Sequence, residues 1–182
     1  MKNVYDIEQA NRNNFRSSLE ALARPGELQT VTPLFGSGLL AMASVLLYAE
    51  VSYFYQGTLD FELIQALCGA RNTSQENADY LFFDSLDHKH LVQAKTGTAE
   101  SPEQGATILF SCPDFDGDNT RVKLSGPGID GTKELCLPVM TAFLDELSEK
   151  NELFPMGIDL FLVSQKNTLL GLPRTTRIEV II

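Results

Sequence analysis

The stretch FPMGIDLFLVSQKNTLLGLPRTTRIEV, residues 154–180, decides the fold. Its segment 158–163 is almost continuously apolar, which is typical of a strand that is buried on both faces at the centre of a sheet. Residues 169–172 follow across the polar pair Lys166-Asn167 and are expected to pair back on that strand. A final strand is predicted at 178–182. The last part of the chain is therefore expected to be rich in β-structure, with a hairpin at its centre.

Towards the amino terminus, helices and strands are expected to alternate. Phe15, Leu19 and Leu22 form an apolar stripe that predicts a first helix, and Pro25-Gly26 ends it. The pattern as a whole predicts an α/β protein with a mixed, three-layer sheet, in one domain that spans residues 1–182. The other expected elements are an extended segment at 28–33, helices at 39–49 and within 84–94, a helix capped by Thr58 and ended by Gly69, strands at 51–55, 80–83, 107–112 and 121–125, and a helix that begins near Pro138 with Met140, Phe143, Leu144 and Leu147 on one face.

Composition and charge exclude several classes of partner. Hydrophobic residues make up 43% of the 182 residues and charged residues 21%, as in an ordinary globular protein. The net charge of -10, without a basic cluster, argues against nucleic acid and against anionic membranes, since both are bound through Lys and Arg. No signal peptide is evident, and the most apolar run, 38–49, is too short to span a bilayer. We therefore expect a soluble, cytoplasmic protein.

The cysteines Cys68, Cys112 and Cys136 are odd in number and fit no metal-binding or redox spacing. We expect three reduced thiols, most of them buried, as is usual in a reducing compartment. A nucleophilic cysteine would need a base that the fold brings next to it, and the sequence does not indicate one.

Pro173-Arg174-Thr175-Thr176-Arg177 joins two predicted strands and holds the chemistry that is most unusual in this acidic chain. An arginine followed by two hydroxyl groups favours binding of an anion, because a guanidinium can grip a phosphate or a carboxylate with two hydrogen bonds. The alternative is that Arg174 ties the loop down or pairs with Asp159 across the hairpin. The two interpretations are not exclusive.

Gly36-Ser37-Gly38-Leu39-Leu40-Ala41 spells GxGxxA before a predicted helix, with Asp60 further along the chain. In dinucleotide-binding folds such glycines let the backbone approach a pyrophosphate, and a later acidic residue binds the ribose. The alternative is a loop that ends in a serine N-cap. The second glycine-rich loop, 125–131, lacks the Lys-Ser or Lys-Thr of a phosphate-binding P-loop, and a tight connection is expected there.

Two further clusters resemble metal sites only in part. His88 and His90 could share one face of a strand, but the chain has no other histidine. Asp114, Asp116 and Asp118 have the spacing of a calcium loop, but Ser125 stands where the bidentate glutamate would be. We expect a solvated loop and a solvated acidic turn, and no bound metal.

Taken together, the order and spacing of these landmarks resemble the PhnH family, a subunit of the bacterial carbon–phosphorus lyase system. The matching segments span nearly the whole chain: Phe15-Arg16 to Pro25-Gly26, Ser44-Val45-Leu46-Leu47, Gly97-Thr98, Pro102-Glu103, Gly105-Ala106-Thr107, Leu124, Gly126-Pro127-Gly128-Ile129, Phe154-Pro155-Met156-Gly157-Ile158-Asp159-Leu160, and Pro173-Arg174-Thr175-Thr176 to Glu179-Val180.

The resemblance implies a fold similar to the large domain of pyridoxal-phosphate (PLP) transferases, without that cofactor or any other. It also implies a homodimer that joins PhnG, PhnI and PhnJ in a complex. That complex displaces adenine from ATP with a phosphonate and forms a ribose 1-phosphonate 5-triphosphate, and another subunit later cleaves the carbon–phosphorus bond.

The resemblance assigns no catalytic residue to this subunit. As groups that bind an anion, such as ATP or phosphonate, or a partner subunit, we select Arg174, Thr175, Thr176, Asp159 and Arg16. The leading hypothesis is a subunit that is not catalytic alone. The alternatives are a free-standing enzyme that binds a nucleotide cofactor through Gly36 to Ala41, and a structural scaffold that binds no ligand.

Overall fold

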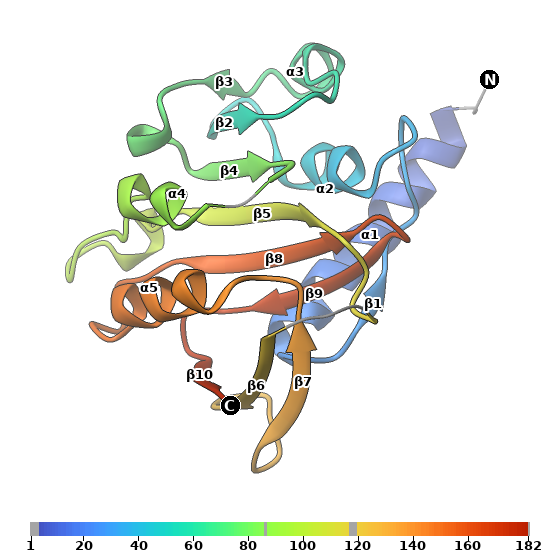
Figure 1. Ribbon diagram of the computed structural model, residues 1–182. Coiled ribbons are helices and arrows are strands. Elements are labelled where there is room, and N and C mark those ends of the chain that lie inside the picture. Colours follow the sequence, from blue (N-terminus) through green and yellow to red (C-terminus); the bar gives the residue numbers. More distant parts are fainter. Residues whose placement is uncertain (1–3, 86, 117–119, 182) are drawn as a thin grey trace.

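The structure is a computed structural model that describes residues 4–85, 87–116 and 120–181 (Figure 1). Its helices are α1 (Val4–Ala23), α2 (Gly38–Leu46), α3 (Glu62–Cys68), α4 (His88–Gln93) and α5 (Thr141–Asn151), with short 3-10 turns η1 (Gln75–Asn77) and η2 (Pro102–Gln104). Its strands are β1 (Gln29–Thr30), β2 (Ser52–Gln56), β3 (Arg71–Asn72), β4 (Tyr80–Phe83), β5 (Thr107–Cys112), β6 (Thr120–Ser125), β7 (Lys133–Leu137), β8 (Asp159–Ser164), β9 (Thr168–Leu172) and β10 (Arg177–Val180).

A seven-stranded sheet in the order β1-β9-β8-β5-β4-β2-β3 forms the centre of the molecule. The five strands from β8 to β3 are parallel, and β9 returns antiparallel to β8. The predicted hairpin is confirmed, since Leu162 lies opposite Leu170 in its register. The sheet is mixed because this hairpin adds an antiparallel strand beside the parallel ones.

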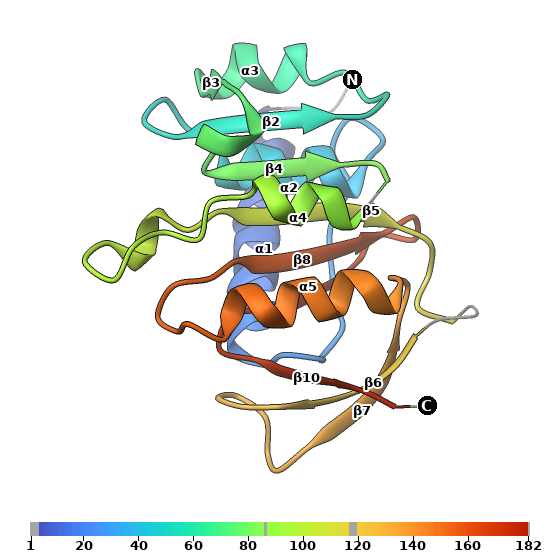
Figure 2. The ribbon, with the colours of Figure 1, turned by 60° about the vertical axis from the view of Figure 1, so that its left-hand side comes forward.

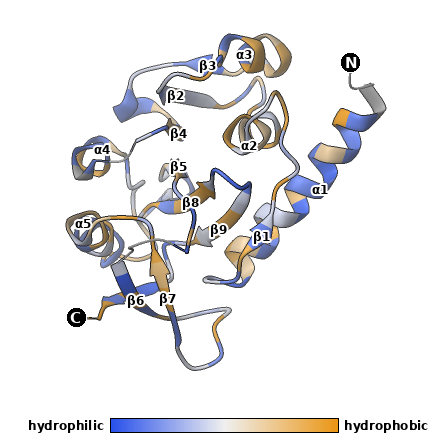
Figure 3. Ribbon diagram, turned by 45° about the vertical axis from the view of Figure 1, so that its right-hand side comes forward, coloured by the Kyte–Doolittle hydropathy of each residue, from blue (hydrophilic) through white to orange (hydrophobic). Residues whose placement is uncertain are grey.

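The two faces of the large sheet are covered by different elements, which gives three layers (Figures 1 and 3). On one face α1, α2 and α3 enclose a core around Phe82, Leu109 and Phe161. On the other face α4, α5 and a small sheet enclose a core around Phe83, Phe110 and Leu162. The alternation along each strand follows from the period of two, since neighbouring side chains point to opposite faces.

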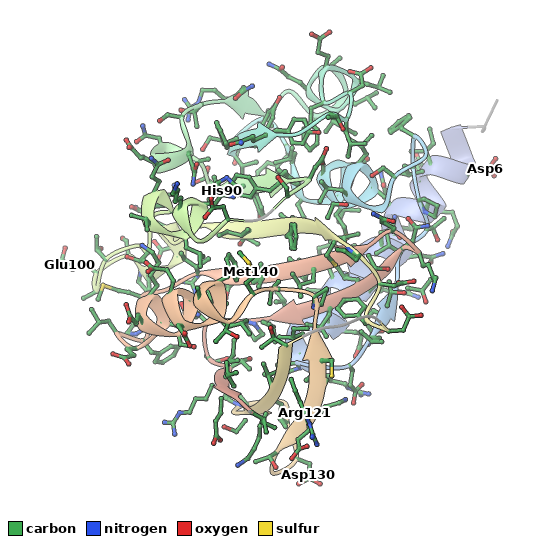
Figure 4. The ribbon with its side chains drawn as sticks, viewed as in Figure 1. Asp6, His90, Glu100, Arg121, Asp130 and Met140 are labelled. Carbon is green, nitrogen blue, oxygen red and sulfur yellow. The ribbon has the colours of Figure 1, made fainter. Side chains whose placement is uncertain are left out.

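The small sheet has the order β10-β6-β7 and is antiparallel throughout. It extends beyond the large sheet on the α5 side, and Arg121 and Asp130 project from it into solvent (Figures 2 and 4). The predicted last strand is therefore confirmed as β10, but it belongs to this second sheet, which the sequence pattern did not separate from the first.

Most predicted elements are confirmed, and two corrections concern α1 and α3. In α1 Leu22 of the predicted stripe packs against the core, but Phe15 and Leu19 are 49% and 53% exposed, and the buried face holds small residues such as Ala10 and Ala21. Small residues are favoured there because the backbone of α1 lies against β9, where a Cβ on Gly171 would come within 2.7 Å of the Ala21 backbone.

In α3 the N-cap is Phe61 and not Thr58, although Gly69 ends the helix in the left-handed conformation as predicted. The hydroxyl and amide of Thr58 instead donate to Asp84. The sequence pattern also missed β3 and β7.

In α5 the helix begins at Thr141, after Pro138, and Met140 is 61% exposed while Phe143, Leu144 and Leu147 are buried. The resemblance to the large domain of pyridoxal-phosphate transferases stays a prediction.

Among the described residues, no helix is both long enough and apolar enough to cross a lipid bilayer.

Candidate functional site

The predicted site residues lie on the turn by which the chain leaves the large sheet and enters the small one. Strand β9 ends at Leu172, Pro173 follows, and the amide of Thr176 donates to the Pro173 carbonyl at 2.8 Å before β10 begins. A proline suits this position, because the backbone bends away from the sheet and the missing amide is not needed for a ladder. The turn therefore presents Arg174 and Thr175 at the junction of the two sheets.

Arg174 pairs with Asp159, which begins β8. The Arg174 amide donates to Asp159 Oδ1 at 2.8 Å, and Nη2 donates to Oδ2 at 2.6 Å. Nε lies 3.3 and 3.2 Å from the same two oxygens. Backbone and side chain of one arginine thus engage both oxygens of one carboxylate. The pairing across the hairpin that the sequence suggested as an alternative is confirmed.

The guanidinium of Arg174 also joins two more segments of the chain. Its Nη1 donates to the carbonyl oxygens of Pro102, at 2.7 Å, and of Pro155, at 3.5 Å. The side chain is only 13% exposed. Since all three nitrogens donate within the protein, Arg174 braces the strand β8, the η2 turn and the segment before β8. Binding of an anion by this arginine stays a prediction.

The brace requires close backbone contacts at two glycines. A Cβ on Gly105 would overlap the Gly157 carbonyl oxygen and lie 2.8 Å from Arg174 Nη1. Gly157 has φ 149°, and a Cβ there would overlap the Asn151 side-chain oxygen. That oxygen accepts from the Ile158 amide at 2.7 Å, while Asn151 Nδ2 donates to the Ile158 carbonyl at 3.1 Å. The end of α5 is therefore fastened to the start of β8.

Thr175 and Thr176 line a cavity of about 830 Å³ between α5 and the small sheet. Phe154, which is 61% exposed, and Arg177 also line it. The Thr176 side chain is 6% exposed, and its hydroxyl oxygen is buried without a hydrogen-bond partner among the described residues. A buried hydroxyl of this kind is uncommon in proteins and marks a position where a ligand or partner atom would be favoured.

Arg16 does not join this group. It is exposed on α1, in the layer on the opposite face of the large sheet from α5 (Figures 1 and 2). Of the five predicted residues, the fold brings Arg174, Thr175, Thr176 and Asp159 together and leaves Arg16 apart.

The glycine-rich segment before α2 is an N-cap, as its alternative interpretation stated. The Ser37 hydroxyl accepts from the amides of Leu39, at 3.1 Å, and Leu40, at 3.3 Å. These are amides that a bound phosphate would otherwise use. Asp60 accepts from the Glu62 amide at the start of α3. This arrangement differs from the dinucleotide fingerprint, in which the glycine-rich turn follows a strand of the parallel sheet.

His90 and the acidic turn have structural contacts, and the side chain of His88 lies outside the part of the structure that is described. His90 lies in α4, where its Nδ1 accepts from the Asp87 amide at 3.2 Å within a capping box. Asp114 and Asp116 pair with Lys166, and Asp118 lies outside the described residues. Within the part of the chain that the structure describes, no group of three His, Cys, Asp or Glu is placed to hold a metal.

The three cysteines are free, as predicted, but only Cys112 is buried, and Cys136 is exposed. Burial raises the pKa of the Cys112 thiol to about 12, so this residue is protonated at neutral pH and is a poor nucleophile.

Sequence reasoning missed the partners that hold the turn in place. Arg174 donates to the backbone carbonyls of Pro102 and Pro155, and Asn151 bonds to the backbone of Ile158 before β8. Bonds to backbone atoms leave no pattern in a sequence. Gly105 and Gly157 lie in the segments that resemble the PhnH family. The fold shows why a glycine is needed at each position, because Arg174 and Asn151 approach their backbones closely.

Comparison with known proteins gives two matches that cover nearly the whole chain. The family model for PhnH, described as a bacterial phosphonate metabolism protein, matches residues 4–179. A relative from Stutzerimonas stutzeri, the putative C-P lyase subunit protein HtxG, is 31% identical over 169 residues. The alignment covers 91% of this chain and 84% of the relative.

Proposed function

The chain belongs to the PhnH family of bacterial phosphonate metabolism proteins, and on that premise we propose that it is a subunit of a carbon–phosphorus lyase complex. The observation that supports the proposal is the match over residues 4–179, together with the similarity to HtxG, a putative C-P lyase subunit. Both extend over nearly the whole chain, and the family match includes the braced turn as well as the core.

We propose further that the chain forms a homodimer in the cytoplasm and joins PhnG-, PhnI- and PhnJ-like subunits. In that complex it supports the displacement of adenine from ATP by a phosphonate, without catalysing this step alone. The contacts of Arg174 favour a supporting role. Its guanidinium is occupied by Asp159 and Pro102, so it fixes the shape of the turn and has little capacity left to grip a substrate.

The surface proposed for the complex is the cavity between α5 and the small sheet. Phe154 supplies an exposed aromatic ring, a residue type that is enriched in protein interfaces. Arg177 supplies an exposed positive charge, and Thr176 a buried hydroxyl without a partner in the described chain. Thr175 and Thr176 are thereby assigned to contact with a partner subunit or its anionic substrate.

The first test is co-expression of this chain with PhnG-, PhnI- and PhnJ-like proteins, followed by purification through a tag on this chain. Co-purification of the three, with conversion of ATP and a phosphonate by the assembly, is the expected result. A chain that purifies alone under conditions in which the other three assemble with an authentic PhnH protein contradicts the proposal.

The second test separates the surface from the fold. Arg177→Glu reverses an exposed charge at the cavity, whereas Arg121→Glu reverses an exposed charge elsewhere on the small sheet. We expect the first to weaken co-purification and the second to leave it unchanged. Thr176→Val keeps the side-chain shape and removes only the hydroxyl, and is expected to lower the assembly or conversion as well. Wild-type behaviour of both cavity variants would exclude this surface.

A further inference from the structure

A second cavity, of about 340 Å³, lies at the opposite edge of the large sheet from the Arg174 brace. It opens where the parallel strands β4, β5 and β8 end. Phe83 pairs with Phe110, and Ser111 pairs with Val163, so Asp84, Ser111 and Val163 form one row across the three strands. Ligands of α/β sheets bind preferentially at this carboxyl edge.

The row faces the side of the sheet that α2 covers. Val163 belongs to the core between the sheet and α2, and the register gives Asp84 and Ser111 the same orientation. Ser37 at the start of α2 and Leu59 before α3 complete the wall. The cavity is thus enclosed by strand ends on one side and by the start of a helix on the other.

The connections of the sheet change direction at this edge. From β2 the chain passes through α3 to β3 at the outer end of the sheet, whereas from β4 it passes through α4 to β5 on the inner side. The two helices lie on opposite faces. The carboxyl ends of β2 and β4 are therefore a topological switch point, which is where α/β folds leave room for a ligand.

Asp84 is held rigidly at the switch point by one of its two oxygens. Its Oδ2 accepts from the Thr58 amide at 2.7 Å, from the Thr58 hydroxyl at 3.0 Å and from the Tyr55 hydroxyl at 3.2 Å. A Cβ on Gly57 would overlap the Asp84 carboxyl group, so the absence of a side chain there lets the carboxylate approach the backbone.

The other oxygen of Asp84, Oδ1, is buried and has no hydrogen-bond partner among the described residues. A buried carboxylate oxygen without a donor is costly, and each such case calls for an explanation. Since Asp84 lines the cavity, a donor on a bound molecule would satisfy it.

The lining restricts the chemistry of that molecule. Among the described residues, Asp84 is the one ionisable side chain on the cavity wall, and no lysine or arginine lines it, so a phosphate or another anion is disfavoured. A metal cation would require several oxygen ligands, commonly with more than one carboxylate. The wall otherwise offers hydroxyl and amide groups, including Ser111, Gln165 and Asn167, which can both donate and accept.

Ser37 adds a directional preference. Its oxygen accepts from two amides, which uses its lone pairs, so its hydroxyl can act towards a ligand only as a donor. Asp84 Oδ1 is only an acceptor. A ligand hydroxyl can serve both, because it donates and accepts, whereas an ammonium group only donates.

We propose that this cavity binds an uncharged, hydroxyl-rich group, with one ligand hydroxyl donating to Asp84 Oδ1, and D-ribose serves as the probe. The proposal goes beyond the subunit role assigned above and does not depend on the surface around Thr176, since the two cavities lie at opposite edges of the sheet.

The test uses the purified full chain and D-ribose, followed by amide chemical shifts in two-dimensional NMR. Ribose should shift the amides of Ser37, Leu59 and Ser111 in a saturable manner. Ribose 5-phosphate should bind no more tightly than ribose. Absence of saturable shifts at these residues, or tighter binding of the phosphorylated sugar, overturns the proposal.

Asp84→Asn is the decisive variant. The asparagine carbonyl can still accept from Thr58 and Tyr55, while its amide replaces the unpaired oxygen by a donor. Ribose affinity should fall about tenfold or more, as for the loss of a hydrogen bond to a charged group. Asp60→Asn, a change of the same charge in the neighbouring loop between β2 and α3, outside the cavity, should leave affinity unchanged.

A second variant does not depend on the Asp84 network. Ser111→Leu fills the cavity from the neighbouring strand β5, and should also abolish the ribose shifts while the melting temperature stays close to that of the wild type. Unchanged ribose affinity in either Asp84→Asn or Ser111→Leu excludes this cavity as the site.

Discussion

Two aspartates at opposite edges of the large sheet show what the same side chain does in two settings. Asp159, at the amino edge, has both carboxylate oxygens engaged by Arg174. Asp84, at the carboxyl edge, has one oxygen engaged by Thr58 and Tyr55, while the other has no partner among the residues that the structure describes. A carboxylate whose two oxygens both accept hydrogen bonds joins parts of the framework, whereas one with a single engaged oxygen leaves a place for a donor on another molecule. The carboxylate of Asp159 therefore serves stability, whereas that of Asp84 is left available for binding.

Arg174→Ala should produce the largest loss of stability. It leaves Asp159 poorly solvated and without its cation, and it releases the η2 turn. We expect a decrease of about 3 kcal/mol in the free energy of unfolding, measured by urea denaturation at neutral pH. The control is Arg121→Ala, which breaks an ion pair whose side chains are 61% and 51% exposed and should cost less than about 1 kcal/mol. Equal effects of the two variants would show that the amino edge is not braced by this pair.

A pair of glycine variants compares the two edges directly. Gly105→Ala forces a methyl group against the Gly157 carbonyl, which is backbone and moves little, so we expect a loss of about 2 kcal/mol. Gly57→Ala presses on the side chains of Tyr55 and Asp84. These can shift, so about 1 kcal/mol should be lost, together with ribose binding. Thermal melts and ribose titrations of both variants test this, and a greater loss of stability at Gly57 would reverse the comparison.

Tyr55→Phe should have a smaller effect, confined to the carboxyl edge. The variant removes a donor to Asp84 and leaves the Leu59 amide without its acceptor. A decrease of about 1 kcal/mol in the free energy of unfolding is expected. Burial raises the pKa of the Tyr55 hydroxyl to about 12, and it also raises the pKa values of Tyr53 and Tyr80. Absorbance at alkaline pH should therefore show one fewer late-ionising tyrosine in the variant than in the wild type. A variant with an unchanged titration curve would contradict the buried position of this hydroxyl.

The smallest expected effect is the dependence of stability on pH that comes from His90, which lies in α4 and belongs to neither edge. Its ring stacks on Phe83 with centroids 4.1 Å apart, and burial lowers its pKa, against a smaller opposing effect of Asp87. The unfolded chain therefore binds a proton more readily than the native one, and stability should fall as the pH drops through about 6.5. Between about pH 7.5 and 5.5 we expect a loss below about 1 kcal/mol. Urea midpoints of His90→Asn should depend less on pH than those of the wild type, and an identical dependence would assign the effect elsewhere.

Strong local patterns predicted much of the fold. The apolar runs at β4, β5 and β8 and the hairpin to β9 were expected at nearly their observed bounds, because buried strands leave continuous apolar segments. Strand β1 lies within the extended segment expected at 28–33, whereas the two-residue strand β3 and strand β7 leave almost no pattern. The separation into two sheets depends on pairings distant in sequence. The apolar stripe of α1 gave a wrong expectation for Phe15 and Leu19, which face outwards, because small residues of the helix pack on the sheet instead.

The Asp159 and Asp84 sites also differ in how far the sequence could predict them. The pairing of Arg174 with Asp159 was foreseen as an alternative, since both lie in one recognisable stretch of sequence. Asp84 received no role of its own, because its partners Thr58 and Tyr55 come from a neighbouring strand and loop and its unpaired oxygen is a property of the fold alone. A sequence shows which groups are present, but it does not show which lone pairs remain unused.

Strand β10 has a consequence for the order in which the chain is synthesised. Its residues Arg177–Val180 pair with Ser125 to Val122 of β6, so β6 lies in the middle of the small sheet only once β10 has been added. During translation β6 and β7 leave the ribosome first, and β6 then presents an open row of amides and carbonyls while the whole of α5, β8 and β9 is still being made. Until β10 arrives, the nascent chain is open to pairing with other strands, and protection from chaperones or neighbouring subunits would matter most in that interval.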